Sequence, residues 1–459
     1  MVNSKLFNAL FNAKYPFILR GGIFILLCLS TIFSSPLIAQ NPIFQGYSDP
    51  AMYVANGKMY MVVGKDESPK LKNFIMPYWS IFSSTNLMNW TLESTIDPKD
   101  TYLGANYKYC WAADMTSSNG KYYFYYSNHG LETGVLEAQK PEGPYVDVLK
   151  KAIVPKEYSA NFEYDPTVFT DDDGQKYLIF GRDGQLGKNI LHYQIAKLDS
   201  TMLGLAEKSR DLLTNQTFGF GTAKAARDHS YFHKYNGIYY LSCAGIYMTS
   251  KNVYGPYVNP RNCGQDKGHT SFAEYNGQSY HAWEWTCEPF GNRIYRQVMM
   301  TYLHYKNNGD MVSDPDFLQA GKHYAYGVGN YSAKMDTIQA EWYFNKSKTA
   351  LKKDAPDGGF EVQNLQNNDF LNFPNVKDLQ ANATINFQIS AKTKGGKIDI
   401  RKDSPTGTLL GTCTIPNTKS FKSYKMVSCS LKNTAETHNL YFVFKGGKGD
   451  LAHLDWFKF

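Results

Sequence analysis

This chain of 459 residues has few of the features that mark membrane, zinc-binding or nucleic-acid-binding proteins. Its apolar run from Ile23 to Phe33 is too short for an ordinary transmembrane helix, so no stable membrane insertion is expected. The cysteines show no Cys-x-x-Cys or Cys/His spacing typical of a zinc site. A formal net charge of +7 is too small to indicate binding to nucleic acid.

Residues 1–39 have the composition of a secretory signal peptide. Lys5, Lys14 and Arg20 provide a positively charged front, the run from Ile23 to Phe33 is the apolar core, and Ala39 is a small residue at the cleavage site. The long basic front is typical of bacterial export signals. We therefore expect a secreted or periplasmic protein.

Five times the chain has an Asn-Gly or Asp-Gly pair followed by a run rich in aromatic and β-branched residues. The pairs are Asn56-Gly57, Asn119-Gly120, Asp173-Gly174, Asn236-Gly237 and Asn276-Gly277. These pairs tolerate the positive φ of a type I′ turn, so each repeat predicts a β-hairpin. The turn glycines are 63, 54, 63 and 40 residues apart, which suits a four-stranded sheet with its loops. The pattern predicts an all-β fold with a five-bladed β-propeller over residues 40–325.

The strand before each hairpin should line the central channel of the propeller. Each of these strands carries an ionisable residue at a similar offset from its turn: Asp49, Asp114, Asp165, Asp228 and His269. Carboxylates gathered at one end of a narrow channel perturb each other's pKa values, as acid–base chemistry requires. These residues are the candidate site.

From about residue 335 the sequence changes to short alternating strands, which predicts a β-sandwich (jelly roll) over residues 331–459. Gln339 and Glu341 alternate on its first strand and Asp455 lies on its last, so their oxygens are candidate ligands for a structural calcium ion. Cys413 and Cys429 lie on consecutive predicted strands and are candidates for a disulfide.

The repeated motifs resemble glycoside hydrolase family 43. The resemblance covers roughly residues 42–320, and its motifs come in the family's order: YSDPAMYVANGKMYMVVGKD, WAAD, YDPTVFTDDDGQKYLIFG, HKYNGIYYLS and GHTSFAEYNGQSY. It implies a secreted five-bladed propeller that hydrolyses arabinose- and xylose-containing glycans. The C-terminal region resembles carbohydrate-binding module family 6 in IRKDSPTGTLLGTCTIPNT and the closing LDWFKF.

The family resemblance also implies roles for individual residues. The family inverts configuration with one carboxylate that activates water and one that protonates the leaving oxygen. By motif, Asp49 matches the general base and Asp165 matches the aspartate that tunes the acid and orients the sugar. Trp111 matches an aromatic wall of the pocket, and Arg296 matches an arginine near the substrate. His269 matches a position where the family often holds calcium or another ion.

One position departs from the family. The family's general acid is a glutamate, and the matching residue here is Asp228, whose carboxyl is withdrawn by one methylene. Three interpretations remain open: Asp228 is the acid for a differently seated sugar, His229 takes the role as a histidine does in a related propeller family, or the acid is lost and the propeller only binds glycan.

The sandwich also departs from its family. The face that usually holds a sugar between a Tyr and a Trp, with an Asn nearby, aligns to Asn364, Phe421 and His453. Phe421 can still stack on a sugar, but the clamp is incomplete. Either another surface of the domain binds glycan, or the domain is a structural appendage.

The leading hypothesis is a monomeric inverting glycosidase that removes terminal sugars from a polysaccharide or oligosaccharide, of the α-L-arabinofuranosidase or β-xylosidase type. An alternative in the same class is a hydrolase of marine galactans with galactose or anhydro-galactose units. The alternative from another class is a catalytically silent glycan-binding propeller.

Overall fold

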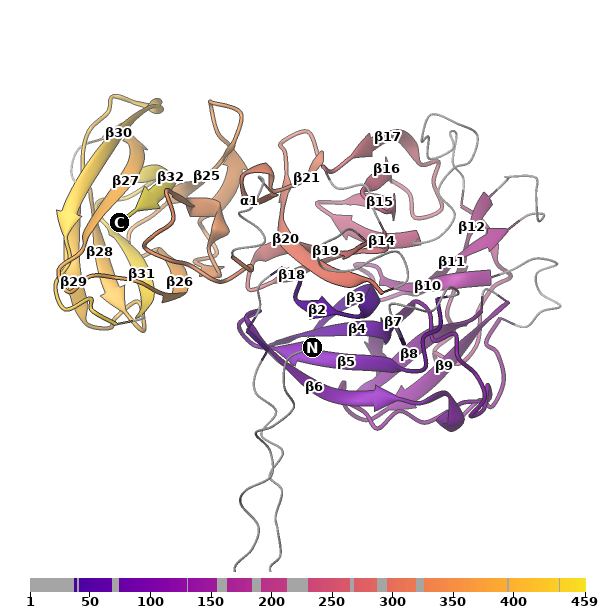
Figure 1. Ribbon diagram of the computed structural model, residues 1–459. Coiled ribbons are helices and arrows are strands. Elements are labelled where there is room, and N and C mark those ends of the chain that lie inside the picture. The colour runs from indigo at the N-terminus through magenta and orange to yellow at the C-terminus, as the bar shows by residue number, and fades with distance from the viewer. Residues whose placement is uncertain are drawn as a thin grey trace, which may run out of the picture. The chain divides into compact units, whose positions relative to one another are not determined.

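The structure is a computed structural model, shown in Figure 1. It describes residues 37–38, 41–67, 74–129, 131–154, 163–183, 191–212, 230–264, 268–286, 295–318, 326–393, 396–436 and 438–459. The expected signal segment 1–39 lies outside the described residues, except for 37–38. Among the described residues, no helix has the length and apolar character needed to cross a membrane.

Five antiparallel sheets form the propeller, and each begins with the inner strand that the repeats predict. The first blade contains β3 (Tyr47–Ala55), β4 (Lys58–Lys65), β5 (Trp79–Ser84) and β6 (Asn89–Ile96), with β1 (Leu37–Ile38) at its edge. The second contains β7 (Ala113–Ser118), β8 (Lys121–Asn128) and β9 (Glu132–Ala138). The third contains β10 (Glu163–Thr170), β11 (Lys176–Asp183), β12 (Leu191–Lys197) and β13 (Arg210–Asp211).

The last two blades complete the ring. The fourth contains β14 (Ser230–Tyr235), β15 (Ile238–Cys243), β16 (Ile246–Ser250) and β17 (Val258–Asn262). The fifth contains β18 (Thr270–Tyr275), β19 (Gln278–Trp285), β20 (Gln297–Tyr305), β21 (Met311–Ser313) and β2 (Phe44–Gln45). The predicted five-bladed architecture is confirmed.

Four of the five predicted hairpin turns have both central residues at positive φ, as a type I′ turn requires. At the first, Asn56 and Gly57 have φ of 50° and 72°, and the flanking Ala55 and Lys58 are paired. At Asp173-Gly174 the predicted hairpin is present, but its turn is not type I′: β10 and β11 are joined by the longer loop 171–175. Aspartate side chains accept local backbone N–H groups there, Asp171 from Asp172 and Asp173 from Gln175, and these bonds stabilise the longer loop.

The ring closes through a strand that the repeats did not indicate. We expected the segment at 302–311 to finish the last blade, and β20 and β21 do lie there. In addition β2, which precedes the first blade in sequence, pairs with β20 through Phe44 and Val298. The side chain of Asn41 strengthens this closure, since it donates to the carbonyl of Met300 (2.8 Å) and accepts from its N–H (2.9 Å).

The C-terminal region is a sandwich of two sheets. One contains β24 (Leu351–Asp354), β25 (Phe360–Leu365), β32 (Ala452–Lys458), β27 (Thr384–Ala391) and β30 (Ser420–Ser430), with β22 (Ile338–Gln339) beside β32. The other contains β23 (Asn345–Lys346), β26 (Phe370–Val376), β31 (His438–Lys445), β28 (Gly396–Lys402) and β29 (Leu409–Ile415). Between them Phe373, Phe387, Phe442 and Phe457 pack edge-on or tilted, as buried aromatic rings prefer.

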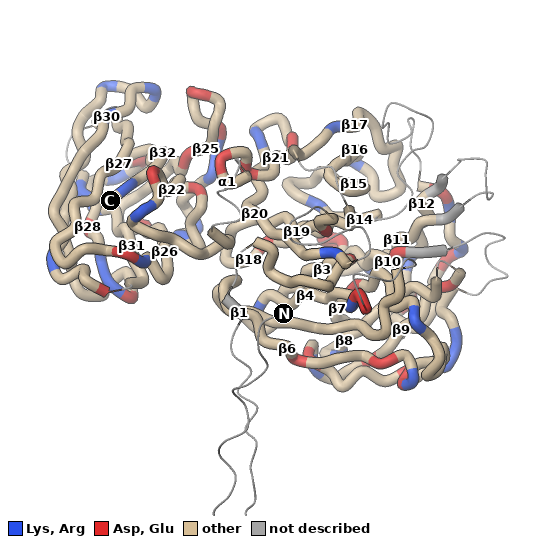
Figure 2. The backbone as a smooth tube through the Cα atoms, viewed as in Figure 1, with Lys and Arg blue, Asp and Glu red and all other residues tan. Residues whose placement is uncertain are grey.

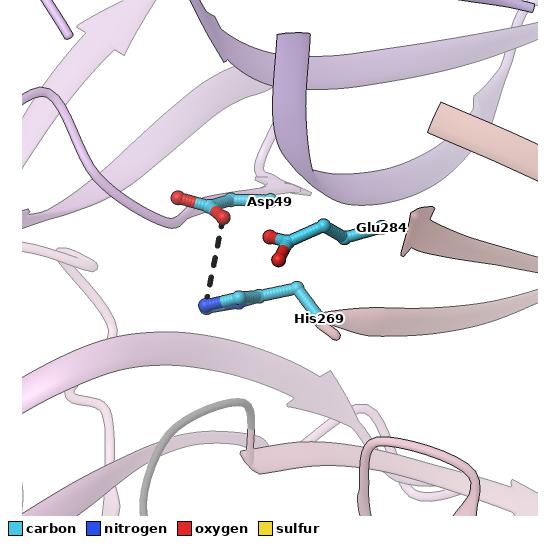
Figure 3. A group of neighbouring side chains, drawn as sticks. All are labelled: Asp49, His269 and Glu284. Carbon is cyan, nitrogen blue, oxygen red and sulfur yellow. Dashed lines mark ion pairs between the residues drawn. The ribbon is translucent and has the colours of Figure 1, made fainter. Parts of the chain in front are cut away.

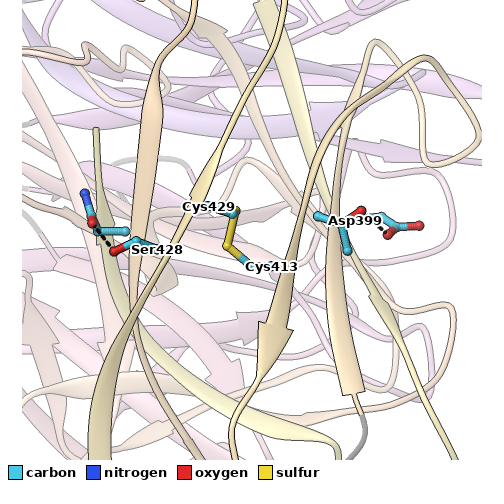
Figure 4. The surroundings of a disulfide bond; sticks show 6 residues. Asp399, Cys413, Ser428 and Cys429 are labelled. Atoms are coloured by element: carbon cyan, nitrogen blue, oxygen red, sulfur yellow. Dashed lines mark hydrogen bonds between the residues drawn. A yellow bond between two sulfur atoms is a disulfide. The ribbon is translucent and has the colours of Figure 1, made fainter.

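The predicted disulfide between Cys413 and Cys429 is present (Figure 4). Cys413 is on β29 and Cys429 is on β30, so the bond joins edge strands of the two different sheets. A crosslink of this kind limits the freedom of the unfolded chain and so favours the folded sandwich.

The fifth blade and the sandwich share one hydrophobic core. Trp342, in the short 3₁₀ segment Ala340–Trp342, stacks parallel to Tyr302 of β20, and its indole N–H donates to Asp314 at 2.6 Å. On β19, Gln278 is fully buried and donates to the carbonyls of Glu341 (2.5 Å) and Tyr343 (3.1 Å). The sandwich is therefore packed against the propeller by apolar and polar contacts together.

Charged residues of both signs are interspersed over the outer strands of the first two blades, as Figure 2 shows near β6, β8 and β9. Lys58 pairs with Glu93, and Lys121 pairs with Glu137. Exposed pairs of this kind contribute about 0–1 kcal/mol each, so these strands depend mainly on their buried face for stability.

Candidate active site

The inner strands of the five blades converge on a small cavity at the channel. Ionisable or hydroxyl side chains line it from every blade: Asp49, Asp114, Asp165, Thr167, Ser230, His269 and Thr270. Of the candidates expected from the sequence, the structure therefore brings Asp49, Asp114, Asp165 and His269 together. Asp228 and His229 lie outside the described residues, directly before Ser230, where β14 begins.

Asp49 and Asp165 enter the cavity by the same local device. Each precedes a proline at a β-bulge, where the pairing register of β3 or β10 shifts. Each also has positive φ, 56° and 54° respectively, which aspartate tolerates better than most residues. Pro50 and Pro166, which follow, lack a backbone N–H, so the bulge leaves no N–H group unpaired at these positions. The Asp-Pro pair therefore builds a bulge that turns a carboxylate towards the channel.

Arg296 holds Asp49 in place. Its guanidinium donates to Asp49 at 3.0 Å, to Glu284 at 2.9 Å and to Asp66 at 2.8 Å. All four side chains are at most 7 % exposed. Buried charges are stable only when they are paired and hydrogen-bonded, and here one cation faces three carboxyl groups. Burial raises the pKa of Glu284 well above its usual range. The charge of Arg296 opposes this rise, and the charge of Asp49 adds to it.

His269 lies between the two bulge aspartates. Its Nε2 is 3.5 Å from the nearer oxygen of Asp49 and 3.9 Å from that of Asp165. Figure 3 shows Asp49, His269 and Glu284 directed towards one another from three separate segments. The ligand atoms of these three residues all lie within 4.8 Å of one another, so this group can hold a cation.

Asp114 differs from the other channel carboxylates because both of its oxygens accept backbone N–H groups. One oxygen accepts from Met115 and the other from Val168, each at 2.8 Å. Val168 is on β10, so Asp114 links the inner strands of the second and third blades. Burial raises the pKa of Asp114 to about 7, although the two N–H groups favour the charged form.

Trp111, expected as an aromatic wall, is half-buried just before the cavity-lining residues Ala112 and Ala113. Its indole N–H donates to the carbonyl of Phe74 at 3.0 Å, and its own carbonyl accepts from the indole of Trp79 at 2.6 Å. These two bonds fix the ring beside the channel.

The three expected calcium ligands of the sandwich, Gln339, Glu341 and Asp455, each lie near further carboxyl groups. Glu341 is buried and lies with His304 and Asp314 of the propeller, whose ligand atoms are all within 4.8 Å of one another. Gln339 instead donates to Asp316 at 3.4 Å. Burial, together with the charges of Asp357, Glu361 and Asp316, raises the pKa of Asp455 to about 7. The charge of Asp455 also acts on Glu341, so these two residues interact, and the calcium site itself stays a prediction.

The three sandwich residues expected at the sugar-binding face do lie together, but they are engaged with protein. The ring of His453 stacks on Phe421 with centroids 4.0 Å apart and 1° between the planes. Both imidazole nitrogens are bonded to carboxylates, one to Glu361 at 3.1 Å and one to Asp450 at 2.9 Å. One face of Phe421 is therefore covered by His453. The backbone N–H of Asn364 also donates to Asp450, at 3.2 Å.

Two residues of the channel cluster were missed at the sequence level, Asp66 and Glu284. Each lies at the end of the second strand of its blade. Asp66 directly follows β4 in VVGKD, and Glu284 is near the end of β19 in AWEW. A charged residue at the end of a buried strand was the available signal, because such residues need a buried partner.

Family models match both parts of the chain. The family model for glycosyl hydrolases family 43 matches residues 39–311, and that for carbohydrate binding module family 6 matches residues 339–459. An arabinoxylan arabinofuranohydrolase of Paenibacillus polymyxa is 27% identical, with 90% of this chain and 72% of that protein covered. The arabinoxylan arabinofuranohydrolase of Bacillus subtilis is 25% identical, with 94% of each covered.

Solved structures are similar in fold. A family 43 arabinoxylan arabinofuranohydrolase from Bacillus subtilis, in complex with cellotetraose, has a TM-score of 0.53 and 22% identity, over 91% of this chain and 97% of that one. CoXyl43, a β-xylosidase/α-arabinofuranosidase from a compost microbial metagenome, was solved with xylotriose in a calcium-free form. It has a TM-score of 0.50 and 25% identity, over 61% of this chain and 96% of that one.

The raised pKa of Asp114 leads to a prediction about stability. In the unfolded chain this carboxyl loses its proton near its ordinary pKa of about 3.9, whereas the folded protein retains the proton until about pH 7. The free energy of unfolding should therefore fall as pH rises from 4 to 7, by on the order of 4 kcal/mol at most, relative to an Asp114→Asn variant. Denaturant unfolding of both proteins at several pH values measures the difference, and parallel curves would contradict it.

Proposed function

The chain belongs to glycosyl hydrolases family 43, and from this premise we propose that it removes arabinofuranosyl or xylosyl units from arabinoxylan or its oligosaccharides, with inversion of configuration. The supporting relatives are the arabinoxylan arabinofuranohydrolases, which align over nearly the whole chain. The chain is thus a glycoside hydrolase, and the substrate, the stereochemistry and export from the cell by residues 1–39 are parts of the proposal.

One observation carries the proposed mechanism: Asp49 is held at the channel by Arg296 at 3.0 Å with His269 at 3.5 Å. The guanidinium holds the carboxyl group of Asp49 at the channel, where a carboxylate can accept a proton from water. Asp49 is therefore the general base, and it directs water to the anomeric carbon from one side of the sugar.

The remaining roles are those that the family resemblance implies. Asp165 lies opposite, across His269, and binds the sugar while it tunes the acid. In this proposal Asp228 delivers the proton to the leaving oxygen, and His229 is the alternative acid. Trp111 forms an apolar wall against which the sugar ring packs.

We propose in addition that the protein binds calcium. In the sandwich, Gln339 and Asp455 lie near Asp316 and Asp357. Calcium is a hard cation that prefers oxygen ligands, and these side chains provide them. In the channel, Asp49, His269 and Glu284 offer three ligand atoms, of which one belongs to the base. When bound, calcium would neutralise carboxylates at either place.

Replacement of the base gives a direct test of the function. Asp49→Asn keeps the volume and the contact with Arg296 but cannot accept a proton, so kcat on arabinoxylan oligosaccharides should fall roughly 10²–10⁴-fold. Release of arabinose and xylose from a panel that also includes galactans, followed by NMR to determine the anomer first formed, checks substrate and stereochemistry together. An Asp49→Asn enzyme with more than about a tenth of the wild-type rate would refute the assignment.

The acid is tested through the leaving group. Asp228→Asn should slow substrates with a basic leaving oxygen far more than aryl glycosides, because a phenolate departs without a proton. His229→Ala, the matched control, should slow both substrates to a similar and smaller extent. The reverse pattern in kcat/KM would assign the proton to His229.

Calcium is tested by thermal unfolding of the full chain. Chelation should lower the Tm, and calcium at 100 times its Kd should restore about 2.7 kcal/mol of stability. Asp455→Asn should remove this response if the ion lies in the sandwich, whereas Glu284→Gln should remove it if the ion lies in the channel. Identical melting curves of the wild type in chelator and in calcium would exclude both sites.

A further inference from the structure

A line of hydrogen bonds runs from the channel into the fifth blade. Thr270, at the start of β18, lines the cavity, and its Oγ1 lies 2.5 Å from Nε2 of His281 on β19. Nδ1 of His281 lies 2.7 Å from Oγ of Ser313 on β21. The hydroxyl of Ser313 in turn donates to Sγ of Cys263 at 3.4 Å. We call these four residues the hydroxyl relay.

The members of the hydroxyl relay are held in one arrangement. All four are buried, Thr270 with 4 % of its surface exposed and the others with at most 1 %. The backbone N–H of Ser313 donates to the carbonyl of Cys263 at 2.6 Å, which fixes these two residues to each other. The ring of His281 stacks on Phe272 with centroids 4.6 Å apart. Because tightly packed interiors leave such side chains a single arrangement, each hydrogen bond of the relay has a defined direction.

The direction of each hydrogen bond follows from the donor at the far end of the relay. Because Ser313 gives its proton to Cys263, its oxygen accepts from Nδ1–H of His281. Burial, together with the charge of His233, lowers the pKa of His281 to about 3, so the ring is neutral and carries a single N–H. Nε2 of His281 is therefore an acceptor, and the proton that it accepts is that of Thr270.

The other hydroxyl groups that line the cavity also donate into the protein. Thr167 donates to the carbonyl of Ser230 at 2.6 Å, and Ser230 donates to the carbonyl of Asp165 at 3.4 Å. The hydroxyl of Tyr231 donates to the carbonyl of Phe272 at 2.9 Å. Each hydroxyl on the described part of the cavity wall thus has its proton engaged and offers lone pairs to a ligand. Such a wall suits a ligand that brings its own O–H donors, as a sugar does.

We propose that Thr270 accepts a hydrogen bond from one hydroxyl of the sugar in the channel, and that His281 is the positioning residue that fixes this direction. The inference rests on the proposed function, which places a sugar there. It adds a requirement for the substrate: this hydroxyl must be free, so a sugar that is alkylated or acylated at the same position is a poor substrate. The loss arises because a buried acceptor is left without its donor.

Fluorine in place of a hydroxyl tests the direction of the bond, because fluorine is of similar size and cannot donate. An aryl α-L-arabinofuranoside and an aryl β-D-xyloside, each with one hydroxyl at a time replaced by fluorine, give the loss of kcat/KM at every position. At one position the loss should be roughly tenfold greater in the wild type than in Thr270→Val, which has no acceptor. Comparison of the two enzymes cancels the electronic effect of fluorine on the reaction. Equal losses in both enzymes at every position would overturn the proposal.

Three further variants control for packing. Thr270→Ser keeps the hydroxyl and should keep the wild-type loss. Thr301→Val is the matched control, because Thr301 pairs with His281 across β19 and β20 and its buried Oγ1 has no hydrogen bond within the described structure. It should also keep the wild-type loss, and a change as large as that in Thr270→Val would assign the effect to packing and overturn the proposal. His281→Leu, which frees the proton of Thr270, should reduce the loss towards that of Thr270→Val.

Nitrogen NMR of the wild type with isotope-labelled histidine reads the direction without any substrate. The signal of His281, assigned by its disappearance in His281→Leu, should be that of a neutral imidazole with its proton on Nδ1. A proton on Nε2 would make His281 the donor to Thr270 and leave the Thr270 proton free for the channel. That result would overturn the proposal whatever the activity.

A binding measurement separates this inference from the proposed function. If the wild type cleaves none of the unsubstituted glycosides, the proposed function fails, and the same fluorinated series is titrated by calorimetry against Asp49→Asn. The loss of affinity at one position should be roughly tenfold greater in Asp49→Asn than in Asp49→Asn/Thr270→Val. Equal losses in the two proteins, or no heat with either, would refute Thr270 as the acceptor.

Discussion

The site depends on one buried cation. Arg296 is the common partner of Asp49, Asp66 and Glu284, and all four side chains are buried. Burial of four ionisable side chains is costly, and it is offset only if each finds its partners with good geometry. Two of the carboxylates come from the first blade, while Glu284 and Arg296 come from the fifth. The catalytic geometry is therefore formed only when the ring closes.

The contacts that close the ring therefore lie next to those that hold the site residues. β2 crosses from the start of the chain to pair with β20 of the last blade, and Arg296 directly precedes β20. The N–H of Gly46, between β2 and β3, donates to the carbonyl of Arg296 at 2.8 Å. The segment that seals the propeller consequently also sets the position of the arginine that holds the base.

Local signals predicted the hairpins and the channel aspartates, and they failed where the structure depends on distant pairing. Asn56-Gly57 and its repeats fold as expected because a type I′ turn is decided by two residues. The loop at 171–175 differs because three successive aspartates offer side-chain acceptors that compete with the tight turn. Asp66 and β2 could not be assigned from local sequence, since each has its partner more than 200 residues away. Glu284 bonds Arg296 within its own blade, but that arginine is held in turn by Asp49 and Asp66 of the first blade. Glu341 has buried neighbours in the propeller, His304 and Asp314, which its local sequence did not indicate.

The strand β19 links the sandwich to the active site. At one end of β19, Gln278 donates to Glu341 and accepts from the buried ammonium of Lys352 at 2.6 Å. At the other end of the same strand, Glu284 accepts from Arg296. A strand of eight residues is about 26 Å long and stiff, so the two ends cannot move independently. His453 covers one face of Phe421, so the sandwich either binds glycan on another surface or is a structural appendage. Its contact with the fifth blade buries the outer end of the strand that carries Glu284, a partner of Arg296.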